Sequence, residues 1–296
     1  MKARAQFSML PDGRRHFHDG PIDLILEAFG SPREVEAAYD AAARRFTSIL
    51  DELCAELPLL RRPLSSMPEG YVARRMARAV APFQQTHFLT PMAAVAGAVA
   101  EEALEAMTDA ADLARAYVNN GGDIALHLRG AETFRIGMVD RPDRPSLFGR
   151  ATISASDRAR GIATSGCRGR SFSLGIADAV TVIAATAAMA DAAATLIANA
   201  VDLPGHVAIT RTPARRIDPQ SDLGERLVTR AVGALSPSEI SAALAAGADE
   251  AERFRRLGLI ESAALRLANQ TQLVGGDASL YKSRAASPSE LCHAPG

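Results

Sequence analysis

The first part of the chain changes from a strand-like to a helix-like hydrophobic pattern. Residues 4–30 are predicted to form strand, turn and strand, with the turn at 11–13 and an apolar second strand at Ile22–Phe29. The Ser-Pro-Arg-Glu sequence that starts at Ser31 is typical of a helix N-cap with a capping box. Apolar residues then recur at helical spacing, which predicts an amphipathic helix carrying Val35, Ala38, Ala42, Phe46, Ile49, Leu53 and Leu57.

The rest of the chain switches repeatedly between strand and helix patterns. Because strands do not alternate strictly with helices, we predict an α+β fold of mixed or antiparallel sheets covered by helices, in a single domain over residues 1–282. A loose tail is expected at 283–296. The predicted elements are a short basic helix or strand at 71–80, helices at 92–107 and 187–201, strands at 117–120, 124–128, 134–139, 151–156, 161–166, 177–185 and 206–210, a polar loop at 211–224, and mainly helical structure from there to about 273.

Alanine dominates the composition and narrows the choice of core residues. The hydrophobic fraction is 48%, but 59 of the 296 residues are alanine and there is no tryptophan. The core must therefore depend on leucine, isoleucine, valine and ten phenylalanines, with alanine providing helix and close packing. The formal net charge of −1 gives no reason to expect a nucleic acid or an anionic membrane as a partner.

Lysine is absent between Lys2 and Lys282, whereas arginine occurs 31 times. This distribution excludes a Schiff-base lysine, and also the lysine of a P-loop, from the body of the protein.

Several features favour a cytoplasmic protein. The three cysteines are far apart and form no C-x-x-C pair, so neither a zinc ribbon nor a disulfide framework is indicated. The N-terminal residues lack the apolar run of a signal peptide. The most apolar stretch, 177–201, contains Asp178 and Asp191 and makes a poor membrane span.

The first candidate motif is the Asn-Asn-Gly-Gly-Asp sequence at 119–123. Two glycines after a strand permit positive φ and leave backbone amides bare, so the asparagine and aspartate side chains could hold a ribose, a phosphate or a base edge. The alternative is an ordinary hairpin turn, because Asn-Gly is a strong hairpin signal.

The second candidate is the glycine-rich segment at 161–170. It has the G-x-x-x-x-G spacing of a P-loop, but Cys167 and Arg168 stand where that motif needs Lys and Ser or Thr. A turn of this kind can still bind a phosphate through its amides, Ser165 and the guanidinium groups of Arg168 and Arg170. A flexible basic loop is the alternative.

The third candidate is the pair Asp191 and Thr195. Residues four apart share one face of a helix, and a carboxylate with a hydroxyl suits a hard cation such as Mg²⁺. The alternative is that Asp191 only interacts with the positive end of its helix.

These motifs occur in a known order. A small-residue helix is followed by VNNGGDI, then by GIATSG, and then by AVTVIAATAAMADAAAT. Over residues 85–200 the chain resembles the ApbE-like superfamily of flavin transferases. The segments GRSFSLGIADAVTV and RTPARRIDPQSDLG extend the resemblance to an uncharacterised cytoplasmic branch of that superfamily.

The resemblance implies a cofactor set and a site. These transferases use FAD and Mg²⁺ to attach FMN through a phosphoester to a threonine of a target protein. By resemblance, Asp191 and Thr195 hold the metal, together with a carbonyl at 94–96 that we assign to Ala94. The residues expected to contact the flavin nucleotide are Asn119, Asn120, Gly121, Gly122, Asp123, Thr164, Ser165, Gly166, Arg168 and Arg170.

Two departures from the family pattern leave the activity open. The segment at 91–98 lacks the acidic residue and the lysine of the transferases, and the segment at 171–178 lacks their histidine, so no catalytic residue is assigned.

Three functions remain as hypotheses: a divergent Mg²⁺-dependent FMN transferase, a non-catalytic nucleotide-binding accessory or maturation factor, and a different small-molecule enzyme. The expected partners are a nucleotide, a protein substrate and, because alanine-rich faces need cover, a second copy of the chain.

Overall fold

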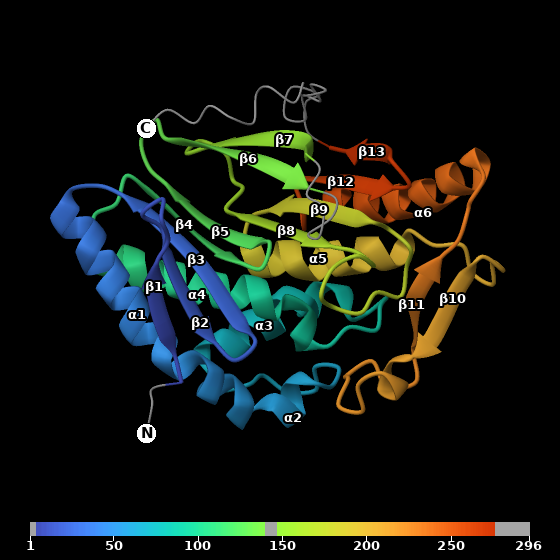
Figure 1. Ribbon diagram of the computed structural model, residues 1–296, viewed down its shortest axis with the longest axis horizontal. Coiled ribbons are helices and arrows are strands. Elements are labelled where there is room, and N and C mark those ends of the chain that lie inside the picture. Colours follow the sequence, from blue (N-terminus) through green and yellow to red (C-terminus); the bar gives the residue numbers. More distant parts are fainter. Residues whose placement is uncertain (1–3, 140–146, 276–296) are drawn as a thin grey trace.

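A nine-stranded sheet forms the centre of the described structure. The computed structural model describes residues 4–139 and 147–275, so the predicted tail at 283–296 lies outside it (Figure 1). Every pair of neighbouring strands in the sheet is antiparallel. The strand order is β1 (Gln6–Met9), β2 (Arg15–Asp19), β3 (Ile22–Phe29), β4 (Arg115–Asn120), β5 (Asp123–Leu128), β8 (Gly161–Ser165), β9 (Ala179–Ala184), β12 (Ser262–Leu267) and β13 (Gln270–Val274).

Helices cover one face of this sheet, which confirms the predicted α+β class (Figure 1). The long helices pack on neighbouring strands: α1 on β2 and β3, α4 on β4 and β5, α5 on β8 and β9 and also on β5, and α6 on β12 and β13. The short α3 packs in turn against α4 and α5. The bounds are α1 (Pro32–Ala55), α2 (Leu57–Leu60), α3 (Tyr71–Val80), α4 (Val95–Ala110), α5 (Ala187–Ala200) and α6 (Pro237–Arg256), with 3₁₀ turns η1 (Ala81–Phe83), η2 (Pro91–Ala94) and η3 (Ala214–Arg216).

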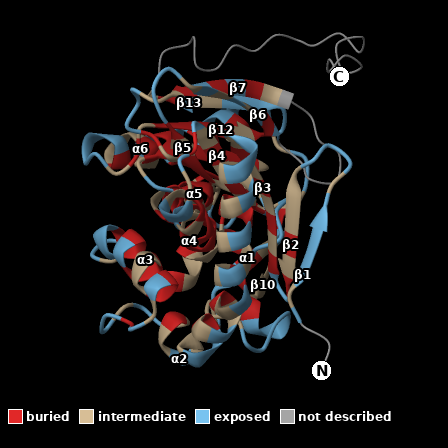
Figure 2. Ribbon diagram, turned by 90° about the vertical axis from the view of Figure 1, so that its left-hand side faces the viewer, coloured by how far each residue is buried: buried red, intermediate tan, exposed pale blue. Residues whose placement is uncertain are grey.

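The opposite face of the sheet is covered in part by a two-stranded hairpin, β6 (Thr133–Val139) and β7 (Leu147–Ser154). Strand residues alternate between the two faces, so Ala163 joins the main core beneath the helices whereas Ile162 joins a smaller core under the hairpin. Figure 2 shows the burial concentrated in α4, α5 and the central strands, while β1 at the sheet edge is exposed.

The helix α1 begins where the sequence predicts. The Ser31 side chain accepts a hydrogen bond from the Glu34 amide at 3.4 Å. The Glu34 carboxylate, however, accepts from the Asp112 amide at 2.8 Å, so it ties α1 to the chain after α4 instead of completing the predicted capping box. A complete capping box occurs at α6, between Ser236 and Glu239.

The structure corrects the predictions at both ends of the chain. Residues 4–30 form three strands rather than two, because a second turn at Gly20 separates β2 from β3. The prediction of mainly helical structure up to 273 is wrong outside α6. There, β11 (Leu227–Val232) pairs with β10 (Ile209–Pro213), and β12 with β13. The strand β12 is buried on both faces, so it lacks the polar alternation that marks a half-exposed strand.

Two other predictions are refined. Residues 71–80, expected as helix or strand, form the helix α3, and the predicted helix at 92–107 begins as the turn η2 and continues as α4. The expected polar loop at 211–224 includes the end of β10 and the turn η3.

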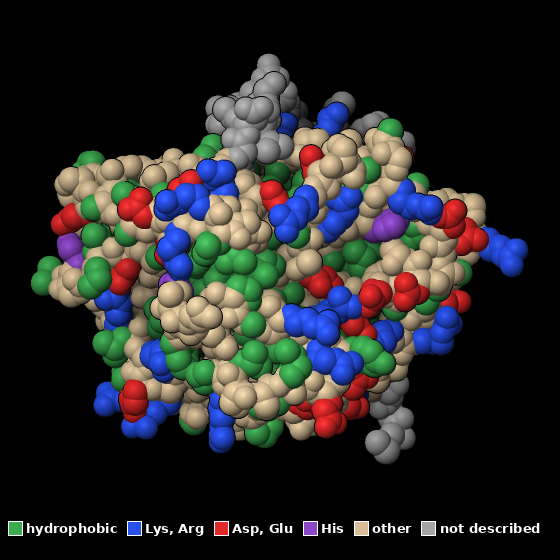
Figure 3. Space-filling model, turned by 180° about the vertical axis from the view of Figure 1, so that it is seen from behind, with side chains coloured by type: hydrophobic (Ala, Val, Ile, Leu, Met, Phe, Trp, Pro, Cys, Tyr) green, Lys and Arg blue, Asp and Glu red, His purple; other side chains and the backbone are tan. Residues whose placement is uncertain are grey.

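Two further features of the described residues concern the helices and the surface charge. Among the described residues, no helix has both the length and the apolar character needed to cross a membrane. On the face shown in Figure 3, basic side chains are interspersed with acidic ones instead of gathering into one patch.

The alanine-rich helices α4 and α5 meet at Gly97. A Cβ atom at this position would overlap the backbone of Ala187 and Ala188. The two helix backbones therefore approach more closely than any side chain larger than hydrogen allows.

We predict that Gly97→Ala destabilises the protein by at least about 1–3 kcal/mol, because overlap with backbone cannot be relieved by a rotamer change. Urea unfolding measures the loss. The matched control is Gly247→Ala in α6, where the added Cβ meets the side chains of Val201 and Leu265 and the loss should be smaller. Equal losses in the two variants would contradict a special role for the contact between α4 and α5.

Candidate nucleotide and metal site

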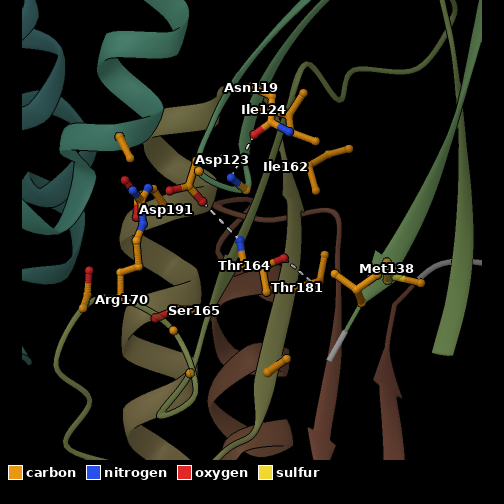
Figure 4. Close-up of a pocket in the computed structure, with 18 of the residues that line it drawn as sticks. Asn119, Asp123, Ile124, Met138, Ile162, Thr164, Ser165, Arg170, Thr181 and Asp191 are labelled. Carbon is orange, nitrogen blue, oxygen red and sulfur yellow. Dashed lines mark hydrogen bonds between the residues drawn. The ribbon is translucent and has the colours of Figure 1, made fainter. Parts of the chain in front are cut away.

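The predicted motifs meet at one cavity of about 400 Å³. The β4–β5 turn, the end of β8 with the loop after it, the first turn of α4 and the N-terminal half of α5 all contribute to its lining, and β6 supplies a further wall. Figure 4 shows Asp123 and Asp191 close together on one side of this cavity, with Arg170 beside them and Met138 of β6 on the far side.

The β4–β5 turn presents backbone to the cavity. Asn120 and Asp123 are paired across it, and Gly121 and Gly122 take φ values of 65° and 115°, which side chains rarely adopt. The Asn119 side chain accepts from the Gly122 amide at 2.8 Å and so fixes the turn. The Arg170 guanidinium lies where a Gly121 side chain would be, so only glycine allows arginine to reach this position.

Two carboxylates from separate elements face the cavity. Asp123 Oδ1 accepts from the Thr164 amide at 3.2 Å, and Asp191 Oδ2 accepts from the Gly97 amide at 3.1 Å. Burial raises the pKa of Asp123 to about 7, although the Thr164 amide and the Arg170 charge oppose this shift. Burial also raises the pKa of Asp191 well above its usual range, and the nearby charge of Asp123 raises it further.

A second carboxylate contact holds α5 in place. Glu101 Oε1 of α4 accepts from the Ala188 amide in the first turn of α5, at 2.7 Å. Together with the bond from the Gly97 amide to Asp191, each helix therefore donates a first-turn amide to a carboxylate of the other. Arg75 of α3 pairs with Glu101 at 3.4 Å and ties this contact to a third helix.

The oxygen atoms at this end of the cavity fit a hard cation. Asp123, Asp191 and Thr195 line it together. This set has only two carboxylates, and the described residues contain no group of three or more His, Cys, Asp or Glu side chains that could hold a metal. Two carboxylates and a hydroxyl suit Mg²⁺, which takes its remaining ligands from water or from phosphate oxygens. Ala96 also lines the cavity, and its carbonyl accepts from Asn120 Nδ2 at 3.1 Å.

The loop after β8 divides its two arginines between different tasks. Arg170 lines the cavity, whereas Arg168 pairs with Asp178 at 3.1 Å. Asp178 also accepts from the Ala268 amide at 2.7 Å, which connects this loop to the β12–β13 turn. Burial raises the pKa of the Cys167 thiol, although the nearby charge of Arg168 opposes this shift.

The structure thus brings together most of the residues that the sequence singles out. Three of them lie elsewhere: Asn120 is buried with its amide on Ala96, Arg168 binds Asp178, and Ala94 is buried in η2 outside the lining. The other residues that the sequence singles out share the lining of this cavity, and their roles in binding stay predictions: Asn119, Gly121, Gly122, Asp123, Thr164, Ser165, Gly166, Arg170, Asp191 and Thr195.

Sequence reasoning missed the wall opposite the carboxylates. Ile136 and Met138 come from β6, and Thr181 of β9 bonds Thr164 through their hydroxyls at 2.9 Å. The β6 residues carry no motif, and only the folding of the hairpin over the sheet places them here. The Thr181 hydroxyl could have been found, because a polar residue interrupts the otherwise apolar run of β9.

We predict that Asp191→Asn stabilises the metal-free protein in EDTA by about 1–3 kcal/mol near pH 8, as expected when a poorly compensated buried charge is removed. Both aspartates have folded-state pKa values above the unfolded ones, so ionisation destabilises the folded state as the pH rises from about 4 through 7. The gain should therefore vanish near pH 4. Urea unfolding across this range checks it, with the exposed Asp109→Asn as the control, and a less stable Asp191→Asn at pH 8 would contradict it.

Comparison with known proteins places the chain in a family. The chain is 41% identical over 145 residues to a UPF0280 protein of Methanopyrus kandleri, covering 49% of this chain and 54% of that protein, so the match spans about half of the relative. It is 39% identical over 180 residues to a UPF0280 protein of Methanothrix thermoacetophila, covering 58% and 71%. A crystal structure of Pseudomonas stutzeri flavinyl transferase ApbE, in its apo form, aligns with a TM-score of 0.45 and 12% identity over 92% of this chain and 94% of that one. The family model described as "AbpE bacteria" matches residues 7–273, and the protein therefore belongs to this family.

Proposed function

We propose that this protein binds a flavin dinucleotide, FAD, together with Mg²⁺ in the cavity between the β4–β5 turn and α5. The observation that carries the proposal is the pair of carboxylates, Asp123 and Asp191, that line one cavity, where burial and the charge of Asp123 disfavour the ionised form of Asp191. A divalent cation meets that need and at the same time attracts the negative pyrophosphate.

Each wall of the cavity supports one part of this ligand. Asp191 and Thr195 would hold the cation, and Asp123 lies beside Asp191 on the same side of the cavity (Figure 4). When bound, Mg²⁺ would neutralise charge on the pyrophosphate oxygens. The bare amides of Gly121 and Gly122 and the Arg170 guanidinium supply donors to the same oxygens.

Transfer of FMN is the finer proposal, and membership of the "AbpE bacteria" family supports it. The described lining contains no lysine, histidine or cysteine side chain. A proton released by an acceptor hydroxyl would therefore pass to a carboxylate of the lining, and we assign this role to Asp123, with Asp191 and Thr195 left to hold the cation. The alternative is an accessory function, in which the protein binds the nucleotide without transferring FMN. This alternative is favoured by the absence of the family's lysine at 91–98 and of its histidine at 171–178.

We predict that the purified protein binds FAD only when Mg²⁺ is present, and that Asp191→Ala and Thr195→Val weaken this binding at least about tenfold. Isothermal titration calorimetry with and without EDTA measures the affinity. Asp109→Asn, at the exposed end of α4, should bind like the wild type. Equal affinity for FAD in EDTA and in Mg²⁺ would refute the cation site.

Turnover is tested separately by following AMP in the same mixtures, with and without an added protein that carries an acceptor threonine. Release of AMP that requires Mg²⁺ and Asp123 supports transfer or hydrolysis at the pyrophosphate. Tight binding without AMP supports the accessory function.

A further inference from the structure

A second cavity adjoins the first on the face of the sheet that is turned away from the helices. It measures about 680 Å³ and lies between β3, β4 and β5 on one side and β6 on the other. Asn119, Ile124, Ile136 and Gly137 line both cavities, so the second one continues the first along the sheet. We call it the aromatic cleft, because Phe29, Tyr117 and Phe134 line it together with Arg115.

A row of side chains on β4 leads from the nucleotide site into this cleft. Residues of β4 alternate strictly in burial, so Asn119, Tyr117 and Arg115 point outward while their neighbours enter the core. At about 3.3 Å per residue, Tyr117 lies about 7 Å from Asn119, and Arg115 lies about 13 Å away. This spacing leaves room for one sugar between a pyrophosphate at the β4–β5 turn and a ring beside Tyr117.

The cleft offers flat, polarisable surfaces. The Arg115 guanidinium lies 4.1 Å from the centre of the Phe29 ring and 5.3 Å from that of Phe134. Arg115 is held there by the Thr133 carbonyl at 2.9 Å and by Glu132 at 3.4 Å. Tyr117 meets Phe134 edge-on, with ring centres 5.8 Å apart. Guanidinium planes and aromatic rings in such an arrangement are suited to stacking on a planar heterocycle.

We propose that the aromatic cleft binds a ring of the same nucleotide whose pyrophosphate occupies the first cavity, with Tyr117 and Arg115 as its contacts. The inference rests on the proposed function. It adds to that function the direction in which the bound nucleotide extends from the cation site, along β4 into the cleft. Adenine and the flavin ring share the chemistry that the cleft recognises, and the probes below separate them.

The test compares Tyr117→Leu with the wild type, using inorganic pyrophosphate, ADP, FMN and FAD as probes, each with Mg²⁺. FAD affinity should fall about tenfold or more, as expected for a lost stacking contact, while pyrophosphate affinity stays unchanged. A matching fall for ADP identifies adenine as the ring in the cleft, and a matching fall for FMN identifies the flavin. Because the chain has no tryptophan, quenching of flavin fluorescence in the second case would report directly on Tyr117, and Tyr117→Leu should relieve it.

Two further variants keep the test decisive. Phe134→Leu changes the same cleft from β6 and should reproduce the loss if Tyr117→Leu folds poorly. Tyr71→Leu, at a tyrosine 68% exposed on α3, makes the same substitution away from the cleft and should change nothing. Unchanged FAD affinity in both cleft variants, or equal losses for FAD and pyrophosphate, would overturn the inference alone. Failure of wild-type protein to bind pyrophosphate with Mg²⁺ would instead remove the proposed function on which it rests.

Discussion

The close approach of α4 to α5 at Gly97 is the contact on which the site depends. Without a side chain at this position, the first turns of the two helices lie backbone to backbone. That approach allows the Gly97 amide to reach Asp191 and the Ala188 amide to reach Glu101. Asp191 is therefore positioned by main-chain atoms of a neighbouring helix, and not by a flexible side-chain partner. The alanine excess that looks like a weak core in the sequence provides the small faces that this approach requires.

The same arrangement places two carboxylates, Asp123 and Asp191, in a site where their ionised forms are poorly solvated. Asp123 and Asp191 accept hydrogen bonds from amides, but burial and mutual repulsion still raise the pKa of Asp191. Elsewhere the buried acids are neutralised: Glu102, for example, contacts both Arg45 and Arg75. Each of the four carboxylates in this network between α1, α3 and α4 has an arginine partner, whereas Asp191 accepts from the Gly97 main-chain amide. This contrast is what we expect of a site that binds a ligand.

Much of the site could be predicted from sequence because its parts are local. Turn glycines, a helix face four residues long and a strand that ends in Ser-Gly each have a short-range signature, and the cavity contains all three. The orientation of single side chains could not be predicted, since the partners of Asn120 and Arg168, at Ala96 and Asp178, lie outside their own motifs, 24 and 10 residues away in the sequence. Buried β12 was equally hidden, because a strand covered on both faces shows no alternation that distinguishes it from a helix.

Strand β4 explains how one sheet can serve both the core and a ligand. Its even-numbered residues, including Val118 and Asn120, face the helices, and Asn120 holds the start of α4 through Ala96. Its odd-numbered residues face β6 and line the aromatic cleft. A shift of one residue in register would exchange these two sets, so the two-residue turn at Gly121 and Gly122 fixes the register between β4 and β5. It determines at once which side chains fill the core, which line the cleft, and where Asp123 meets Asp191.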